Sequence, residues 1–351
     1  MRIIVERPRH VLAGVAAACA LCTAHAQSSV TLYGIVDAYV ARSVTPGTAS
    51  STALLGSGGM ATSVWGLRGK EDLGGGRSAQ FVLESFFRPD TGAAGRVATD
   101  PLFSRNAYVS LLDDNLGQLR VGRITNPYFL AAIRSNPFAD STTFAPVLLQ
   151  SYIPNGSLNP SITGDTSWNN TVSYTTPELG GVSASAMYSF GEKAGDTSKN
   201  KFGFNALYIA GKVVAVASYI QLRFNATPDG DVNVPPGFGK QQAFLAGGSY
   251  DFGFVRAFAQ YQRITTDATT DVRRNGGQAG VSIPLGRGSV LASYAYMRST
   301  VGNAPQSRNT WTVGYDFNLS KRTDLYANYL SDRASGVSSG SLAAIGMRHR
   351  F

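Results

Sequence analysis

Few residues in this sequence could carry covalent or metal chemistry. The histidines are His10, His25 and His349, and both cysteines lie within the first 22 residues. Hydrolases usually activate a nucleophile or a metal through histidine, but His349 stands two residues from the C-terminus with no catalytic neighbour in sequence. A Ser–Lys pair or paired carboxylates stay open, although no motif indicates either. We therefore predict no enzyme, no catalytic residue, no cofactor and no metal site.

The first 26 residues have the composition of a secretory signal peptide. Arg2, Arg7 and Arg9 form a basic start, residues 11–22 are apolar, and Ala24-His25-Ala26 offers a small-x-small cleavage site. The apolar run is too short to span a bilayer as an anchor. We predict a signal peptide over residues 1–26 and one domain over residues 27–351.

Removing this segment changes the inventory of the mature chain. Both cysteines and two histidines leave with it, and the loss of three arginines and Glu6 lowers the net charge from +9 to +7. The remaining Lys and Arg residues are scattered singly, which argues against a nucleic-acid surface. A buried N-terminal helix and a lipid-modified Cys19 are the alternatives for the segment.

The composition of the whole chain favours a membrane β-barrel. It has 39 glycines, 16 tyrosines and 18 phenylalanines, whereas charged residues make up only 15%. No stretch after the leader has the roughly 20 consecutive apolar residues that a membrane helix needs. Many glycines and aromatics behind a signal peptide fit a transmembrane barrel better than a soluble domain.

Alternating segments support this class. In Ser341–Phe351, the residues Ala343, Ile345, Met347 and Phe351 share one face with His349, and Arg348 and Arg350 lie on the other. Four further segments alternate in the same way: 182–190, 255–262, 310–318 and 323–329. Their apolar faces have small residues in mid-strand and aromatics toward an end, as in a lipid-facing belt with interfacial girdles. A soluble β-sandwich would need bulkier inward residues.

The connections alternate in length, which indicates a barrel with short turns at one end and long loops at the other. Short turns near residues 73–76, 113–115, 177–180, 210–212, 251–253, 284–288 and 318–320 alternate with long loops near 43–59, 89–101, 126–166, 191–200, 225–239, 265–271, 299–307 and 332–340. We predict an antiparallel barrel of about sixteen strands, a size that leaves an aqueous channel.

One connection, residues 126–166, is far longer than loop statistics favour. It contains five of the 15 prolines and is apolar for a loop, with Tyr128, Phe129, Leu130 and Phe138 among its residues. A solvated external loop would not carry such side chains. We therefore predict that this loop folds into the lumen of the barrel.

Six segments in register resemble the general porins of Gram-negative bacteria. They are residues 30–37 (VTLYGIVD), 65–76 (WGLRGKEDLGGG), 103–111 (FSRNAYVSL), Gly122-Arg123, 170–177 (NTVSYTTP) and 346–351 (GMRHRF). The resemblance implies an outer-membrane homotrimer of sixteen-stranded barrels whose third long loop enters each pore. It also implies partners: outer-membrane lipid and lipopolysaccharide, small solutes and ions, and an assembly machinery that reads the strand ending in Phe351.

In this family, wall arginines face polar groups on the inserted loop, and the transverse field biases the ions that pass. Carried over to matching positions, the resemblance implies Arg68, Arg105 and Arg123 on the wall and Asp140 on the loop. Arg120 is a further candidate. For each of these arginines, an ordinary lumenal charge without a role in selectivity is the alternative.

Two departures from the family pattern weaken the expected field. Val64 stands where an arginine often precedes the WGLRG stretch, and Ser167 or Trp168 stands where another often precedes the next strand. Arg105 also shares its parity with the outward set Ala107 and Val109, so we expect a bulge or the opposite facing there.

The function predicted is a passive diffusion channel for small hydrophilic solutes and ions, with weak ion preference. The constriction would lie between the 126–166 loop and the wall arginines. The alternative is a substrate-specific outer-membrane channel, in which a row of aromatic side chains or a dense line of basic side chains would run along the lumen. A secreted adhesin is the second alternative.

Overall fold

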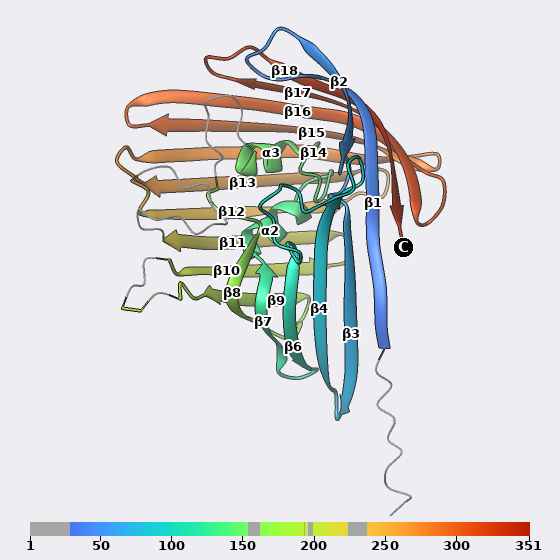
Figure 1. The fold of residues 1–351 in the computed structure, drawn as a ribbon, viewed down its shortest axis with the longest axis vertical. Helices are drawn as coiled ribbons and strands as arrows, with labels where there is room; N and C mark the ends of the chain where they lie inside the picture. The colour runs from blue at the N-terminus through green and yellow to red at the C-terminus, as the bar shows by residue number, and fades with distance from the viewer. Residues whose placement is uncertain (1–28, 154–161, 193, 196–198, 224–236) are drawn as a thin grey trace, which may run out of the picture.

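The computed structural model describes residues 29–153, 162–192, 194–195, 199–223 and 237–351. The predicted signal peptide lies outside these residues. The described chain is almost entirely antiparallel strand, with two short helices (Figure 1). The strands are β1 (Ser29–Val44), β2 (Ser51–Ser57), β3 (Val64–Gly74), β4 (Arg77–Arg88), β5 (Ala93–Ala94), β6 (Asn106–Asp113), β7 (Gly117–Thr125), β8 (Ser167–Thr175), β9 (Val182–Ser189), β10 (Lys201–Ala210), β11 (Val213–Arg223), β12 (Lys240–Asp251), β13 (Arg256–Asp267), β14 (Val272–Leu285), β15 (Gly288–Val301), β16 (Ala304–Asn318), β17 (Thr323–Ala334) and β18 (Gly340–Arg350).

These segments make a closed barrel of sixteen wall strands, as predicted. The two-residue β5 pairs only with the end of β4. β2 and β3 are two halves of one wall strand, because both pair with β1, β2 along Ala38–Val44 and β3 along Ser29–Ile35. Residues 58–63, which we call the shelf, separate these halves and are mostly buried.

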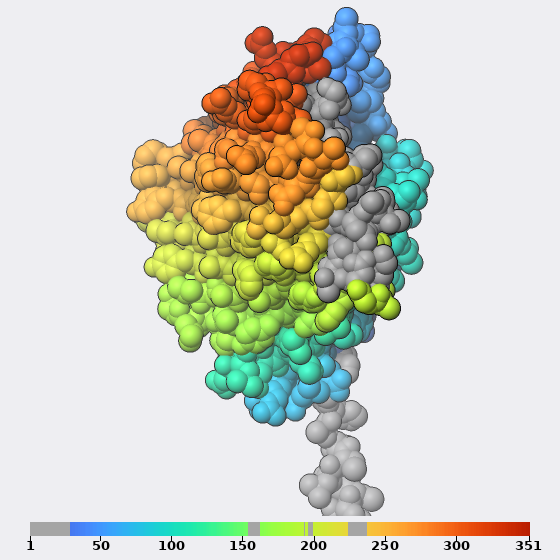
Figure 2. Space-filling model, turned by 90° about the vertical axis from the view of Figure 1, so that its left-hand side faces the viewer, coloured from blue at the N-terminus to red at the C-terminus, as the bar shows by residue number. Residues whose placement is uncertain are grey.

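The first and last strands close the barrel. β18 pairs with β1 from Ile35↔Arg350 to Val44↔Ser341, and the backbones of Gly34 and Phe351 exchange two hydrogen bonds of 3.1 Å. In Figure 2, the red C-terminal strands lie beside the blue N-terminal strand at the top of the view. Closure leaves no strand edge unpaired in lipid.

Alternation in the sequence becomes the two faces of the wall. Val30, Val109, Ile345 and Met347 are more than half exposed on the outside. Inward positions on the same strands carry more polar residues, and Asp37, Ser110 and Arg348 among them are buried. His349 lies on the outer face, as predicted, with Nδ1 2.9 Å from the hydroxyl of Thr323.

The loop lengths differ from expectation at one end of the wall. Strands extend into the loops predicted near 265–271, 299–307 and 332–340, and β15 and β16 are joined by Gly302 and Asn303 alone. The predicted loop 43–59 is likewise mostly strand, since β2 continues the pairing of β1. These segments are rich in Ser and Thr, because strands that extend beyond the lipid have no need of an apolar face.

The long connection between β7 and β8 holds the helices α2 (Pro127–Arg134) and α3 (Pro146–Tyr152). Proline near the start of each helix fits the fixed φ that the first turn requires. The side chain of Asn126 caps α2 by accepting from the backbone N–H of Phe129 at 2.8 Å. Neither these helices nor any other in the described residues is long and apolar enough to cross a membrane.

Candidate functional site

The described residues of the 126–166 loop, 126–153 and 162–166, lie inside the barrel, and their helices pack on the inward face of strands β10 to β16. α2 contacts β10, β11 and β12, and the fully buried Tyr128 donates a hydrogen bond from its hydroxyl to Gln262. Further along, the amides of Gln260 and Gln278 donate to the carbonyl of Ser135 at 3.4 Å. A row of inward glutamines therefore receives the first half of the loop.

α3 is bound to the wall through its polar residues. Gln150 donates to the carbonyls of Ala295 and Arg308 at 3.0 and 3.1 Å and to the hydroxyl of Thr310 at 3.0 Å. Arg308 forms a buried ion pair with Asp332 at 2.8 Å. The same guanidinium donates to two carbonyls at the C-terminal end of α3, at 3.1 and 2.7 Å, where a cation is favourable.

The turn between the helices docks on the shelf. The Ser141 hydroxyl donates to the carbonyl of Gly59 at 2.5 Å, and the Thr143 hydroxyl donates to that of Gly58 at 2.8 Å. The loop thus covers one side of the lumen from β10 to the shelf. The inward face of β3, β4, β6, β7 and β8 stays opposite to it.

Two of the five predicted site residues, Arg68 and Arg120, lie on this opposite wall. The exposed guanidinium of Arg68 lies 5.2 Å from the ring centre of Tyr33, and that of Arg120 lies 5.9 Å from the ring centre of Tyr108. Strand register sets Arg68, Val82 and Tyr108 at one level across β3, β4 and β6. The two arginines therefore belong to one band of the lumen wall.

Arg105 lies just before the first residue of β6, and the pairing of β4 with β6 has no bulge, although a bulge was one of the two arrangements expected there. β6 begins at Asn106, and the Arg105 guanidinium reaches Glu84 at 3.1 Å. Glu84 is buried on the inward face of β4 and also accepts from Tyr33 at 2.8 Å and from Asn106 at 2.6 Å. Arg105 therefore avoids lipid by pairing with a lumenal carboxylate.

Arg123 is buried at the base of the loop and does not line the open lumen. The register of β7 against β8 shifts at this residue, between Gly122 and Ile124. Its guanidinium donates to the carbonyl of Ser104 at 2.9 Å, to Asn169 at 2.5 Å and to Asp165. This arginine joins the two ends of the long loop.

Asp165 is the centre of a charged network between two loops. Arg96, in the connection between β4 and β6, pairs with Asp165 and Asp100, each at 2.8 Å. Burial alone would raise the pKa of Asp165, but hydrogen bonds from Arg96 and the charges of Arg96 and Arg123 hold it below its ordinary value. The carboxylate is therefore charged at neutral pH.

Asp140 lies half-buried in the turn that docks on the shelf, directly before Ser141. No ion pair to it occurs within the described chain. Asn136 shapes this turn by accepting from the N–H of Phe138 at 2.9 Å and donating to the carbonyl of Ala139 at 2.9 Å. The structure thus brings Arg68, Arg105 and Arg120 to one wall and Asp140 to the loop.

Sequence reasoning missed Glu84, which decides how much charge the wall exposes. A signal was present, because Glu84 is the one acid in the apolar stretch 79–87 and has inward parity. It also missed Arg134, which ends α2 and lines a lumenal cavity with Asp251 and Arg256. Their proximity depends on where the loop docks, which no local pattern reports.

The basic C-terminal pair lies inward on β18, as predicted. Arg348 contacts Asp324 and Asp316, both at 3.0 Å, and Arg350 contacts Asp324 at 2.7 Å. These four charges balance one another close to the short turn that joins β16 and β17. Elsewhere in the described chain, no three His, Cys, Asp or Glu side chains are grouped as metal ligands.

Comparison with known proteins agrees with this geometry. A sequence model of the Gram-negative porin family matches residues 13–336. Outer membrane porin protein 32 of Delftia acidovorans is 31% identical over 369 residues, which cover 93% of this chain and 95% of that protein. An outer membrane porin protein of Bordetella pertussis is 30% identical over 398 residues, with 97% of this chain and 98% of that protein covered.

Solved structures give the same result. An anion-selective porin from Comamonas acidovorans superposes with a TM-score of 0.78 at 28% identity, covering 93% of this chain and all of that one. A loop-deletion mutant of OmpT, an outer membrane protein of Vibrio cholerae, has a TM-score of 0.70 at 16% identity, with 92% and 99% covered.

Proposed function

Because this chain belongs to the Gram-negative porin family, we propose that its pore is narrowed between the 126–166 loop and the band of Arg68 and Arg120. The protein is a channel of the outer membrane. The observation that carries the proposal is the docking of the loop on one side of the lumen. Hydrophilic solutes and ions then pass along the other side, where the wall is polar and basic.

We infer a weak anion preference for this passage. Within the described chain, Arg68 and Arg120 have no carboxylate partner, whereas Glu84 offsets Arg105 and Asp165 offsets Arg123. Only part of the predicted basic set therefore supplies uncompensated charge. The relative from Comamonas acidovorans is described as anion-selective, and the absence of arginine at Val64 and Ser167 supports a weaker preference here.

Conductance of the purified protein in a planar bilayer tests the channel, and reversal potential in a salt gradient tests its preference. A marked cation preference would contradict the proposed basic pore. Deleting part of Asn136–Gln150 should raise the size of sugar that enters proteoliposomes. An unchanged cut-off would show that another part of the chain limits passage.

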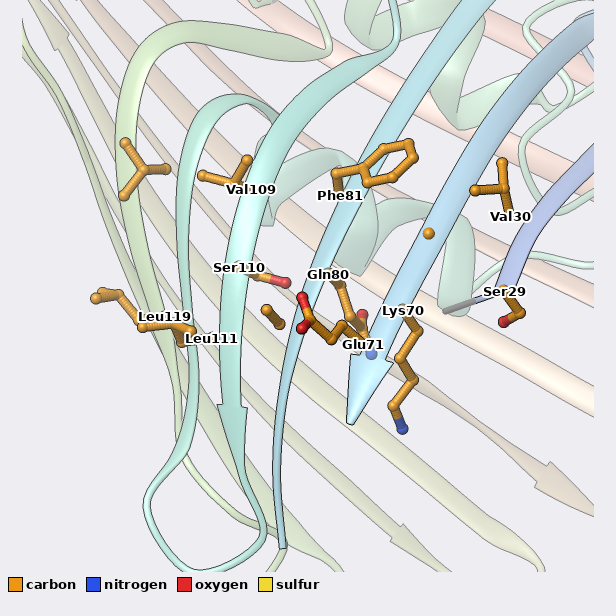
Figure 3. Close-up of a pocket in the computed structure, with 13 residues that line it drawn as sticks. Ser29, Val30, Lys70, Glu71, Gln80, Phe81, Val109, Ser110, Leu111 and Leu119 are labelled. Atoms are coloured by element: carbon orange, nitrogen blue, oxygen red, sulfur yellow. The ribbon is translucent and has the colours of Figure 1, made fainter. Parts of the chain in front are cut away.

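We infer that the chain forms a homotrimer through the outer face of β1, β3, β4, β6 and β7. An apolar groove on this face is lined by Val30, Phe81, Val109 and Leu119 (Figure 3). The ring of Phe81 lies over Gly69, where an added Cβ would come within 2.1 Å of it. No tyrosine faces outward from β3, β4, β6 or β7, all fully described, whereas β13 to β17 carry Tyr261, Tyr294, Trp311 and Tyr329. A wall without exposed tyrosine suits contact with a second copy better than contact with lipid headgroups, where such side chains are enriched.

We propose that the opposite outer wall contacts lipopolysaccharide phosphates. Arg263, Arg273 and Arg298 are exposed outward at the long-loop end of β13, β14 and β15. Register places Asn275 between Arg263 and Arg298, and these arginines have no ion pair within the described chain. Cations at the membrane surface attract anionic headgroups. Changing all three to Gln should reduce the lipopolysaccharide that co-purifies with the barrel, and undiminished co-purification would refute the site.

We further propose that residues 1–26 direct export and that the assembly machinery reads the strand ending in Phe351. Support for the second step is the exposed Phe351 side chain at the closing seam of the barrel. Delivery to the outer membrane of a chain lacking Phe351 should fall. Since the family is one of channels, we infer no enzymatic activity.

A further inference from the structure

A buried carboxylate organises the place where the pore loop meets the wall. Asp37 lies on the inward face of β1 and is 0% exposed. Its carboxylate accepts hydrogen bonds from the backbone N–H groups of Gly59, Met60 and Ala61, at 2.9, 2.8 and 2.9 Å. The hydroxyl of Tyr326 donates a fourth bond, at 2.5 Å. Three of the four donors therefore belong to the shelf.

The backbone of Asp37 holds the shelf as well. Its carbonyl accepts from the N–H of Gly58 at 2.9 Å and from the Ser63 hydroxyl at 3.1 Å. Its N–H donates to the same Ser63 oxygen at 2.9 Å. One residue of β1 thus bonds to both ends and the middle of the six-residue shelf, which interrupts the neighbouring wall strand.

Close packing explains the glycine in the middle of the shelf. A Cβ on Gly59 would lie 1.9 Å from the Tyr326 hydroxyl that donates to Asp37. Met60 is almost fully buried, and its sulfur lies 3.2 Å from the amide nitrogen of Asn328 on β17. The shelf is therefore pressed against the inward face of β1 and β17.

The opposite edge of the shelf receives the pore loop. The two carbonyls that accept from Ser141 and Thr143 belong to Gly59 and Gly58, whose N–H groups are the ones bonded to Asp37. Phe144 packs edge-on against Tyr39 and Tyr326, at centroid distances of 6.0 and 6.4 Å. Each of the two glycines therefore lies between Asp37 and the loop.

We propose that Asp37 is a positioning residue of the pore, which fixes the turn around Asp140 by fixing the shelf. Asp37 does not line the passage itself. It orients the peptide units whose carbonyls receive the loop, and so sets how far that turn stands from the opposite wall. This role rests on the proposed constriction between the loop and the wall arginines.

The central variant is Asp37→Asn, which keeps the shape but replaces one accepting oxygen with an N–H₂ group. That group faces either the N–H groups of Met60 and Ala61 or, with the amide flipped, the N–H of Gly59 and the Tyr326 hydroxyl. At least one hydrogen bond to the shelf is lost and a buried N–H is left unsatisfied, so the ratio of docked to undocked loop should fall roughly tenfold. Because both cysteines lie in the leader, a spin label at Ala139→Cys, an exposed position, reports the mobility of the turn. We expect greater mobility in Asp37→Asn, with more open-channel noise and longer visits to a higher conductance level.

A second variant approaches the same contact from the loop. Ser141→Ala with Thr143→Val removes the donors to the shelf and leaves Asp37 and the wall unchanged. It should raise label mobility and channel noise in the same way, and combining it with Asp37→Asn should add little, because both changes break one contact. If Asp37→Asn fails to fold, this variant decides the question.

Asp324→Asn is the matched control. It removes a carboxylate that is equally buried in the wall but contacts Arg348 and Arg350 instead of the shelf or the loop. In Asp324→Asn, we expect the mobility of the label and the open-channel noise to equal those of the wild type. Equal label mobility in folded Asp37→Asn and wild type, or in the loop variant and wild type, would overturn the proposal. The label reports docking even if the loop deletion leaves the size cut-off unchanged, so a failure of the constriction and a failure of Asp37 are distinguishable.

Discussion

Arg123 donates a hydrogen bond to Asp165, and this pair joins the end of β7 to a residue just before β8. We call this base of the loop, residues 123–126 and 165–166, the stem. Asn126 adds two hydrogen bonds to it: its backbone N–H donates to the carbonyl of Thr166 at 2.8 Å, and its side-chain amide donates to the carbonyl of Asp165 at 3.1 Å. The long loop therefore starts and ends at one clamped point. Its helices are held separately by the wall and the shelf.

The stem should weaken in acid. The pKa of Asp165 in the folded protein lies below the ordinary value of about 3.9. A lowered pKa contributes stability that is complete above the ordinary value and is lost as the pH falls through the folded one. We expect channel noise to rise below about pH 4, in recordings made from pH 7 downward.

Asp165→Asn tests whether that step belongs to this group. The variant should be noisier at neutral pH, because the buried Arg123 and Arg96 lose a partner, and it should lack the part of the acid transition that Asp165 causes. An acid transition of the same size in Asp165→Asn would assign it to another carboxylate.

Arg68 and Arg120 should carry most of the anion preference. Two unit charges about 4 Å apart in water interact by about 1 kcal/mol, which is about a fivefold change in local ion concentration. We therefore expect Arg68→Gln with Arg120→Gln to lower the anion-to-cation permeability ratio by up to about fivefold per charge, read from reversal potentials in a salt gradient.

Arg77→Gln is a suitable control for that measurement. Arg77 is exposed at the start of β4 and pairs with Asp113 at 3.0 Å, so its removal changes the net charge without changing the proposed constriction. An equal shift per charge removed in both variants would mean that overall charge sets the preference.

Much of the barrel wall can be predicted from the sequence, because strands and turns depend on residues that are close together in the chain. Strand alternation, the short turns and the seam at Phe351 follow from side-chain parity and glycine placement. The inserted loop was predictable from its apolar residues. In each case a physical requirement, such as an apolar face toward lipid, determines the types of residues that stand close together in the sequence.

The pairing of the lumenal arginines with carboxylates could not be predicted in the same way. Arg105 and Arg123 match family positions, but their net effect depends on Glu84 and Asp165, which lie 21 and 42 positions away. The order of the shelf could not be predicted, because a segment with several glycines has the composition of an ordinary loop. Only its bonds to Asp37 reveal an ordered segment, and these require the closed barrel.

The anchor of α3 gives a stability prediction. Arg308→Gln would break the buried ion pair that Arg308 forms with Asp332, and removing one partner of such a pair typically costs about 3–5 kcal/mol. The variant barrel should unfold at a lower temperature, measured by the loss of fast gel mobility on heating. Arg308→Gln with Asp332→Asn should recover part of the loss, because no uncompensated charge remains. A double variant as unstable as the sum of both single ones would argue against direct coupling.

The proposed subunit surface makes the sharpest prediction about assembly. Val109 is 62% exposed in the apolar groove of the outer wall, and Val109→Arg would bury a guanidinium between subunits. Ala279→Arg places the same charge on the outer face of β14, away from the groove. An outward arginine at mid-depth costs roughly 2–4 kcal/mol in lipid, so both barrels should be destabilised to a similar extent. Only Val109→Arg should shift unheated protein from trimer to monomer on a native gel, because only this substitution lies in the contact. Loss of the trimer in both variants, or in neither, would place the interface elsewhere on the wall.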